Sequence, residues 1–334
     1  MANVQGTTYL QGFAAGTGGN REDLIDLIVN VDPHDTPFLT THPKTVARHV
    51  YHEWLTDALA GTSTTGAVEG ASHEGVAQAV RARVANWTQI FRKDFDVTGS
   101  QRAVDPAAVT DEYAYQTGKA LKEIARNIET TVFSAVTTAT ASTAARAMKT
   151  LVSFITTEAH HPEAAAIGGD GTSTASARII EETQFNGMLD EIFQNGGNPD
   201  VVYVNSKGKR QISAFTTSTI TSRNIAMADR RLVNSIDIYE SDFGLIQITL
   251  DRFIPVGTST ATAATASNVD LGGRAFFLER GLCRLAFLRP IKHVPLPPGG
   301  DSARGMVLGE LTLEVGNEKA CGQMVGVVNA IANP

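Results

Sequence analysis

Residues 105–136, DPAAVTDEYAYQTGKALKEIARNIETTVFSAV, form the longest stretch of helical periodicity in the chain. Asp105 followed by Pro106 is a typical helix start, because aspartate caps free N–H groups and proline fits the first helical position. We predict a helix over about residues 106–136, which would be about 45 Å long. Apolar residues recur every three or four positions, with one gap at Thr117: Val109, Tyr113, Leu121, Ile124, Ile128, Val132 and Ala135. The other face, expected to be solvated, carries Asp111, Glu112, Lys119, Lys122, Glu123, Arg126 and Glu129.

Two predicted strands precede this helix and flank a long loop. Residues 46–56, VARHVYHEWLT, alternate polar residues with β-branched or aromatic ones. Residues 80–98, VRARVANWTQIFRKDFDVT, place Trp87, Phe91, Phe95 and Val97 on one face. Residues 59–75 between them are mostly small and have no periodicity. The pattern predicts an extended β-hairpin, and a compact domain rarely carries so long a tip unless it serves a function.

The N-terminal region is predicted to form an arm and a short helix. Residues 1–20 are rich in Gly and Thr and nearly uncharged, which is typical of a flexible arm. Residues 21–31, REDLIDLIVNV, have the pattern of an amphipathic helix. Pro33 and Pro37 then impose an extended or turning path.

Helices and strands alternate after residue 136. A helix is predicted over about residues 176–195, because Gly196 and Gly197 form a typical helix end. Strands are predicted at 201–205, 236–240, 245–254, 275–279, 282–289 and 311–315. Ala/Ser/Thr-rich stretches at 137–145, 170–177 and 257–268 are predicted loops. Helices and strands in this order indicate a body that mixes the two, which we class as α+β.

The composition is that of a folded, mildly acidic protein. Of its 334 residues 42% are hydrophobic, and the net charge is −7. An acidic total argues against a dedicated nucleic-acid binder. No apolar run is long enough to cross a bilayer, so no membrane partner is expected. Cys283 and Cys321 are too few for a disulfide framework, which fits a protein made in a reducing cytoplasm, and we interpret both as buried small residues.

One cluster has the residue types of a metal site. Its members are Glu158, His160, His161 and Glu163, but their spacing matches no known site and Pro162 interrupts any helix that would align them. A solvated loop is the favoured interpretation. No catalytic residue, cofactor or metal site is therefore predicted, and a metal-dependent hydrolase at this cluster is the alternative from another functional class.

Residues 200–235 carry more basic than acidic side chains. The basic ones are Lys207, Lys209, Arg210, Arg223, Arg230 and Arg231. They form either a phosphate-facing surface or an ordinary solvated one. In the first case Lys207, Lys209 and Arg210 are the candidate DNA-facing residues, and contact with DNA would be independent of sequence.

The combination of parts is more informative than any motif. An arm, a protruding hairpin and a long helix bury little of themselves and become stable by packing on other copies of the chain. This favours an assembly protein over an enzyme. We expect the hairpin to provide the subunit contacts, with apolar surface around the two tryptophans and acidic side chains that meet arginines of an adjacent copy. The candidate residues are Trp54, Leu55, Asp57, Leu59, Glu69, Glu74 and Trp87.

This order of parts resembles the major capsid proteins of tailed bacteriophages, which have the Hong Kong 97 fold. Short motifs are similar to the capsid family of the SU-ten-like short-tailed phages. They are Glu22-Asp23-Leu24-Ile25-Asp26, Asp32-Pro33-x-Asp35-Thr36-Pro37-Phe38, Glu53-Trp54-Leu55-Thr56-Asp57, Leu288-Arg289-Pro290 and Gly309-Glu310-Leu311-Thr312-Leu313-Glu314. The order of elements matches over about residues 21–328.

The resemblance implies five segments. They are an N-terminal arm over 1–43, an E-loop hairpin over 44–104, the spine helix and peripheral domain over 105–175, an axial domain over 176–270, and return strands over 271–334. It also implies hexamers and pentamers of this chain in an icosahedral shell around double-stranded DNA, located in the virion and assembled in the host bacterial cytoplasm. Scaffold, portal and decoration proteins are implied as further partners. An encapsulin-like cellular compartment, which has the same fold but packages enzymes, is the alternative.

The sequence departs from the family pattern in two ways. Many phage capsid proteins carry a long N-terminal scaffolding extension, whereas only a short arm precedes the first predicted helix here, which implies a separate scaffold protein or none. Some members cross-link their shell through a lysine on the E-loop, but residues 57–80 contain no lysine. We therefore expect a shell without covalent cross-links.

Overall fold

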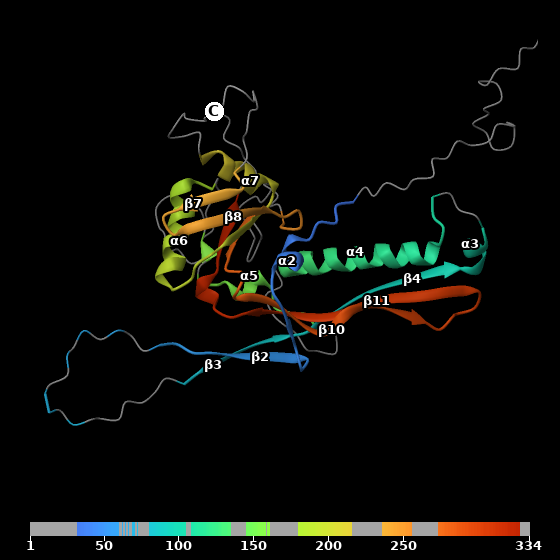
Figure 1. Cartoon of the computed structure of the whole chain (residues 1–334), viewed down its shortest axis with the longest axis horizontal. Coiled ribbons are helices and arrows are strands. Elements are labelled where there is room, and N and C mark those ends of the chain that lie inside the picture. Colours follow the sequence, from blue (N-terminus) through green and yellow to red (C-terminus); the bar gives the residue numbers. More distant parts are fainter. Residues whose placement is uncertain are drawn as a thin grey trace, which may run out of the picture.

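The computed structural model of the chain describes residues 32–59, 80–104, 108–134, 145–157, 159–160, 180–215, 236–255 and 273–327, with six further positions between residues 62 and 72. The predicted arm and the predicted helix 21–31 lie outside these residues, as do most of the hairpin tip and nearly all of the three Ala/Ser/Thr-rich stretches. In Figure 1 the described elements form a compact block, an elongated layer of one long helix beside long strands, and a two-stranded ribbon that extends the other way.

The elongated layer contains a four-stranded sheet with the strand order β1-β10-β11-β4. Its strands are β1 (Lys44–Val46), β10 (Cys283–Leu296), β11 (Ser302–Val315) and β4 (Gln89–Thr98). β11 pairs antiparallel with both neighbours, and β1 runs parallel to β10. A Cβ atom added to Gly305 of β11 would lie 2.5 Å from the Phe95 ring and 2.6 Å from the Tyr113 hydroxyl. Only glycine fits at this position, because the side chains of Phe95 and Tyr113 pack directly against the backbone of β11.

The long helix is α4 (Glu112–Val132), and it is shorter than predicted. Its N-cap is Asp111, whose carboxylate accepts a hydrogen bond from the Tyr113 backbone N–H at 3.0 Å. The expected start at Asp105 is wrong, because Ala108 has a φ of 65°, and a right-handed helix does not continue through such a residue. The helix is therefore about 31 Å long rather than about 45 Å.

One side of α4 packs on the sheet and the other is mostly solvated, as predicted. Ile124, Ile128 and Val132 are buried. Glu129 is an exception, because it was expected on the solvated face and is fully buried. It is covered by α2 (Pro37–Thr41), a short helix in a stretch that was expected to be extended or turning, with Pro37 in the first turn.

The two strands expected before the long helix are each divided. Residues 46–56 contain the end of β1 and all of β2 (Tyr51–Thr56), and residues 80–98 contain β3 (Ala82–Trp87) and β4. β2 and β3 pair antiparallel as a separate two-stranded sheet. The second division falls at Thr88, whose buried hydroxyl donates to a Glu310 carboxylate oxygen at 2.7 Å.

The compact block contains a six-stranded sheet with the order β5-β12-β9-β6-β8-β7. Its strands are β5 (Ala159–His160), β12 (Gly322–Val327), β9 (Gly273–Leu278), β6 (Val201–Val204), β8 (Gly244–Leu250) and β7 (Ile238–Ser241). All four residues of β6 are buried, which confirms the predicted buried strand. The predicted helix 176–195 is α6 (Glu182–Gln194), and Gly196 beyond its end has a φ of +83°.

Several elements were not predicted. They are β12, the first part of β11, α7 (Ser206–Ser213), α3 (Gly99–Ala103), α5 (Leu151–Phe154) and the 3-10 helix η1 (Glu318–Ala320). Most are short, and the first part of β11 contains two glycines that weaken a strand pattern.

Two hydrophobic cores stabilise the fold. One joins α4 and α2 to both larger sheets, and the other fills the space between α6, α7 and the six-stranded sheet. The sulfur atoms of Cys283 and Cys321 lie 3.5 Å apart in the first core as buried free thiols, which confirms their interpretation as buried residues. None of the helices in the described part of the chain is long and apolar enough to span a membrane.

Candidate assembly surfaces

The hairpin is anchored to its own chain by aromatic side chains. The indole N–H of Trp54 donates to the Val315 carbonyl at 3.0 Å, and the ring lies 6.0 Å from that of Phe154. Trp87 contacts Tyr51, with ring centroids 4.6 Å apart. The two tryptophans are therefore half-buried within the subunit and contribute only part of the exposed apolar surface expected on the hairpin, and their role in subunit contacts stays a prediction.

That exposed surface lies further along the hairpin. Leu55 is 59% exposed, Leu59 is 98% exposed, and Val80 on the returning strand is 95% exposed. Figure 1 shows the ribbon projecting from the molecule at this point. Transferring a leucine side chain from water to a packed site contributes about 1.5–3 kcal/mol. These residues are thus the strongest candidates on the hairpin for contact with another molecule.

The charged residues of the hairpin pair with each other. Asp57 lies 3.3 Å from Arg81, and Glu53 lies 3.6 Å from Arg83 across the ribbon. Glu69 is exposed, and Glu74 lies outside the described residues. Asp57 already has a partner in its own subunit, so an adjacent copy would have to share or displace Arg81.

Some exposed apolar side chains on the compact block were not predicted. Phe193 of α6 is 56% exposed and lies beside Phe243, with ring centroids 5.3 Å apart. Ile238 and Leu245 are each 65% exposed and lie on the face of the β7–β8 edge that points away from α6, because their neighbours Tyr239 and Ile246 pack on the α6 side. Ile238 lies on β7, an edge strand of the six-stranded sheet.

The three candidate DNA-facing residues lie on α7, and their environments differ. The Lys209 ammonium donates to the backbone carbonyls of Ile236 and Ile248 and pairs with Asp237. Its side chain is only 15% exposed, so Lys209 is a structural residue that joins α7 to β8. Lys207 is half-buried and Arg210 is exposed.

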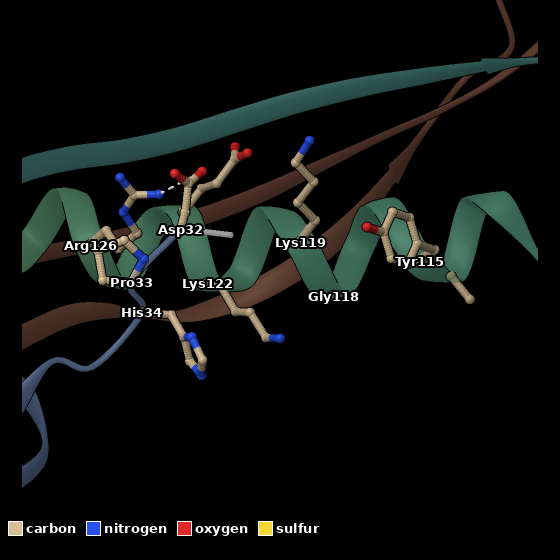
Figure 2. A pocket seen from close by; sticks show the side chains of 10 residues that line it. Asp32, Pro33, His34, Tyr115, Gly118, Lys119, Lys122 and Arg126 are labelled. Atoms are coloured by element: carbon tan, nitrogen blue, oxygen red, sulfur yellow. Dashed lines mark ion pairs between the residues drawn. The ribbon is translucent and has the colours of Figure 1, made fainter. Parts of the chain in front are cut away.

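A groove of about 420 Å³ runs along the solvated side of α4. Its lining residues are Asp32, Pro33, His34, Ala114, Tyr115, Gly118, Lys119, Lys122, Glu123 and Arg126. Figure 2 shows Lys119 and Lys122 projecting from different sides of the helix, with the Arg126–Asp32 ion pair at one end. That pair measures 3.5 Å, and Glu123 pairs with Lys93 at 2.8 Å.

A buried pair of acidic residues joins three parts of the fold. Glu129 of α4 accepts hydrogen bonds from the backbone N–H groups of Phe38, at 2.6 Å, and Leu39, at 3.0 Å, and so satisfies the start of α2. Burial, and secondly the neighbouring charge of Asp251, raise the pKa of Glu129 to about 8. Burial also raises the pKa of Asp251, which follows β8.

The hydrogen bonding of Asp251 leaves one of its acceptors open. One carboxylate oxygen accepts from the Phe253 N–H at 2.8 Å, while the other is buried and has no donor among the described residues. The raised pKa of Glu129 indicates that its carboxyl group is protonated at neutral pH, and its O–H would then be the donor to this oxygen. We interpret the two carboxyl groups as a pair that shares one proton at the junction of α2, α4 and the end of β8.

The family model of the SU10 major capsid protein matches residues 5–328. The chain belongs to this family.

Solved structures with low sequence identity share the fold of this capsid protein. The capsid of cyanophage A-1(L) has a TM-score of 0.64 at 13% identity, covering 92% of this chain and 97% of that chain. The capsid of cyanophage P-SCSP1u has a TM-score of 0.59 at 13% identity, covering 98% and 100%. The SrpI encapsulin of Synechococcus elongatus has a TM-score of 0.57 at 7% identity, covering 94% and 95%. No curated protein sequence matches the chain.

These findings confirm the Hong Kong 97-like α+β fold of this capsid protein and its family. They leave the predicted contact residues to be tested, because none of the comparisons concerns individual side chains. Of the four residues that were the alternative candidate for a metal site, only His160 lies within the described residues. No group of three or more potential metal ligands occurs in the part of the chain that the structure describes.

Proposed function

We propose that this capsid protein assembles as hexamers and pentamers into an icosahedral phage head around double-stranded DNA, and that it catalyses no reaction. The family match over residues 5–328 carries the proposal. Assembly would take place in the host bacterial cytoplasm, with scaffold, portal and decoration proteins as further partners.

The hairpin supports an assembly role through its exposed apolar residues. Burying Leu55 or Leu59 against a neighbour would contribute about 1.5–3 kcal/mol each. An exposed ion pair such as that of Asp57 contributes only about 0–1 kcal/mol. We therefore propose that apolar contacts of the hairpin stabilise the interface between adjacent subunits more than its charged contacts do. Glu69 and Glu74 would add weaker charged contacts.

We also propose that the sheets correspond to the expected segments. The four-stranded sheet with α4 would be the peripheral domain, and the six-stranded sheet with α6 and α7 would be the axial domain. The exposed residues Ile238 and Leu245 at the β7 edge of that sheet would then lie where subunits of one ring meet.

DNA contact is proposed for Lys207 and Arg210 only. Lys209 is held by carbonyl groups of its own chain, so its substitution would disturb the subunit itself. Replacing Lys207 and Arg210 by glutamine should lower the retention of packaged DNA without preventing shell formation. Failure of assembly in this variant would place the two residues in a subunit interface instead.

Microscopy of particles tests the main proposal. The chain expressed alone and with its neighbouring open reading frames should give rings or shells in negative stain. A compact monomer at all concentrations and salt conditions would refute the assembly role. Nuclease-protected DNA inside native particles supports a phage head, whereas packaged enzyme would support an encapsulin-like compartment. Bound metal in elemental analysis would favour the hydrolase alternative.

A further inference from the structure

We propose that residues 21–31 of this chain dock in the groove along α4. The occupant is thus the segment that directly precedes the described part of the chain, and the groove is a binding surface for the N-terminal region. The proposal concerns the subunit itself and goes beyond the role in shell assembly.

The groove contains two lysines that have no ion-pair partner among the described residues, and part of its surface is open. Arg126 and Glu123 each have an ion-pair partner, but Lys119 and Lys122 make no ion pair with any described residue. Figure 2 shows these two lysines on different sides of α4. Ala114, Tyr115 and Gly118 of the same helix also line the groove, and a Cβ atom added to Gly118 would meet nothing within 4 Å. The site therefore accepts an apolar surface that carries acidic groups.

Residues 21–31 have that chemistry. The sequence REDLIDLIVNV places Leu24, Ile25, Leu27 and Ile28 together and adds Glu22, Asp23 and Asp26. Its acidic residues complement the two lysines, and its apolar residues suit the open part of the groove. The exposed ring of Tyr115, 39% accessible, would gain cover.

The path of the chain also fits. Asp32 lies in the groove and pairs with Arg126, and Pro33 and His34 line the same end. The preceding segment therefore starts at the Arg126 end. As a helix, residues 21–31 would span about 16 Å, and the groove from Ala114 to Arg126 spans about 18 Å along α4. Asp26, about 9 Å from Asp32, would reach the level of Lys119 and Lys122.

Hydrogen–deuterium exchange of the full-length chain tests this docking. Amides of residues 22–31 should exchange at least about tenfold slower in the wild type than in Lys119→Glu with Lys122→Glu, because docking protects them. Adding Glu22→Lys, Asp23→Lys and Asp26→Lys to that variant should restore protection. The matched control, Lys292→Glu with Lys319→Glu, changes the charge equally at exposed sites away from the groove and should leave exchange unchanged. Equal exchange in the wild type and the groove variant would overturn the proposal.

A disulfide test identifies the source of the segment. Both natural cysteines are buried, so Asp26→Cys with Lys122→Cys should cross-link under mild oxidation by oxidised glutathione. A monomer band in non-reducing SDS whose two introduced thiols resist maleimide labelling until reductant is added supports docking within one chain. A monomer band with both introduced thiols still free would refute the proposal, and a dimer band would show that a second copy supplies the segment and would also refute the proposal as stated. DNA fragments that bind the groove in a salt-dependent way and leave the exchange of residues 22–31 unprotected would assign it to phosphate instead.

Discussion

The proton shared by Glu129 and Asp251 should make the stability of the subunit depend on pH. The pKa of Glu129 is about 8 in the folded protein, against an ordinary value of 4.5. Between these pH values the folded chain keeps a proton that the unfolded chain has lost. The free energy of unfolding should therefore fall as pH rises from about 4.5 to about 8, and level off above that window.

The size of the pKa shift of Glu129 sets an upper bound for the change in the free energy of unfolding with pH. One pKa unit corresponds to about 1.4 kcal/mol, so a shift from 4.5 to about 8 amounts to at most about 4–5 kcal/mol. The raised pKa of Asp251 has the same sign. In Asp251→Asn the new amide donates to an ionised Glu129, which no longer faces a like charge. We expect the loss of stability between pH 5 and 8.5 to become smaller but not to vanish, because burial, the larger cause of the raised pKa of Glu129, remains.

Urea unfolding of the unassembled full-length chain, followed by the fluorescence of Trp54 and Trp87, measures this at pH 5 to 9. Asp242→Asn replaces an exposed aspartate beside β8 and should unfold like the wild type. Glu129→Gln should also flatten the profile, but it leaves the Leu39 N–H without its acceptor and should cost about 1–3 kcal/mol at all pH values. The same pH dependence in wild type and Asp251→Asn would refute the shared proton.

Four further predictions concern the shell and the subunit. Mature particles boiled in SDS with reductant should give one band at monomer mass, because residues 57–80 contain no lysine; a surviving ladder of multimers would contradict this. Deleting residues 60–74 should leave a folded subunit by circular dichroism and abolish stable shells in micrographs, and normal shells would show that the tip is dispensable. Leu55→Asp with Leu59→Asp should leave the free energy of unfolding within about 0.5 kcal/mol of wild type but reduce the amount of sedimenting assemblies. Unchanged assembly would exclude these leucines from the interface. Lys209→Gln should lower the unfolding free energy by about 1–3 kcal/mol in urea, and unchanged stability would show that the lysine is not structural.

Local sequence patterns predicted those helices and strands whose conformation depends on their own residues more than on contacts with distant parts of the chain. The buried face of α4 followed from spacings of three and four, and β6 followed from a run of four apolar residues. The start of α4 was wrong because two aspartates, Asp105 and Asp111, are equally good caps by type. Only the positive φ of Ala108 distinguishes them, and no residue pattern marks an alanine for that conformation.

The acidic pair and the structural lysine were not predictable in the same way. Glu129 fits the solvated stripe of its helix, and it becomes buried only because α2 covers it. Its partner Asp251 follows β8 in a distant part of the chain, so no spacing rule connects the two. Lys209 belongs to a basic cluster by composition, and its role depends on the β8 carbonyl that it reaches.

The position of the C-terminal strands governs when a subunit becomes complete. β11 lies between β10 and β4, and β9 and β12 lie within the six-stranded sheet, so neither sheet closes before the last strands exist. β4 pairs with a strand that is made about 200 residues later, which at synthesis rates of about 5–20 residues per second means a wait of about 10–40 s. During this time the nascent chain lacks the sheet on which its hairpin is anchored. A chain truncated before β12 therefore lacks a strand inside its six-stranded sheet, and we expect such incomplete subunits to be excluded from the shell.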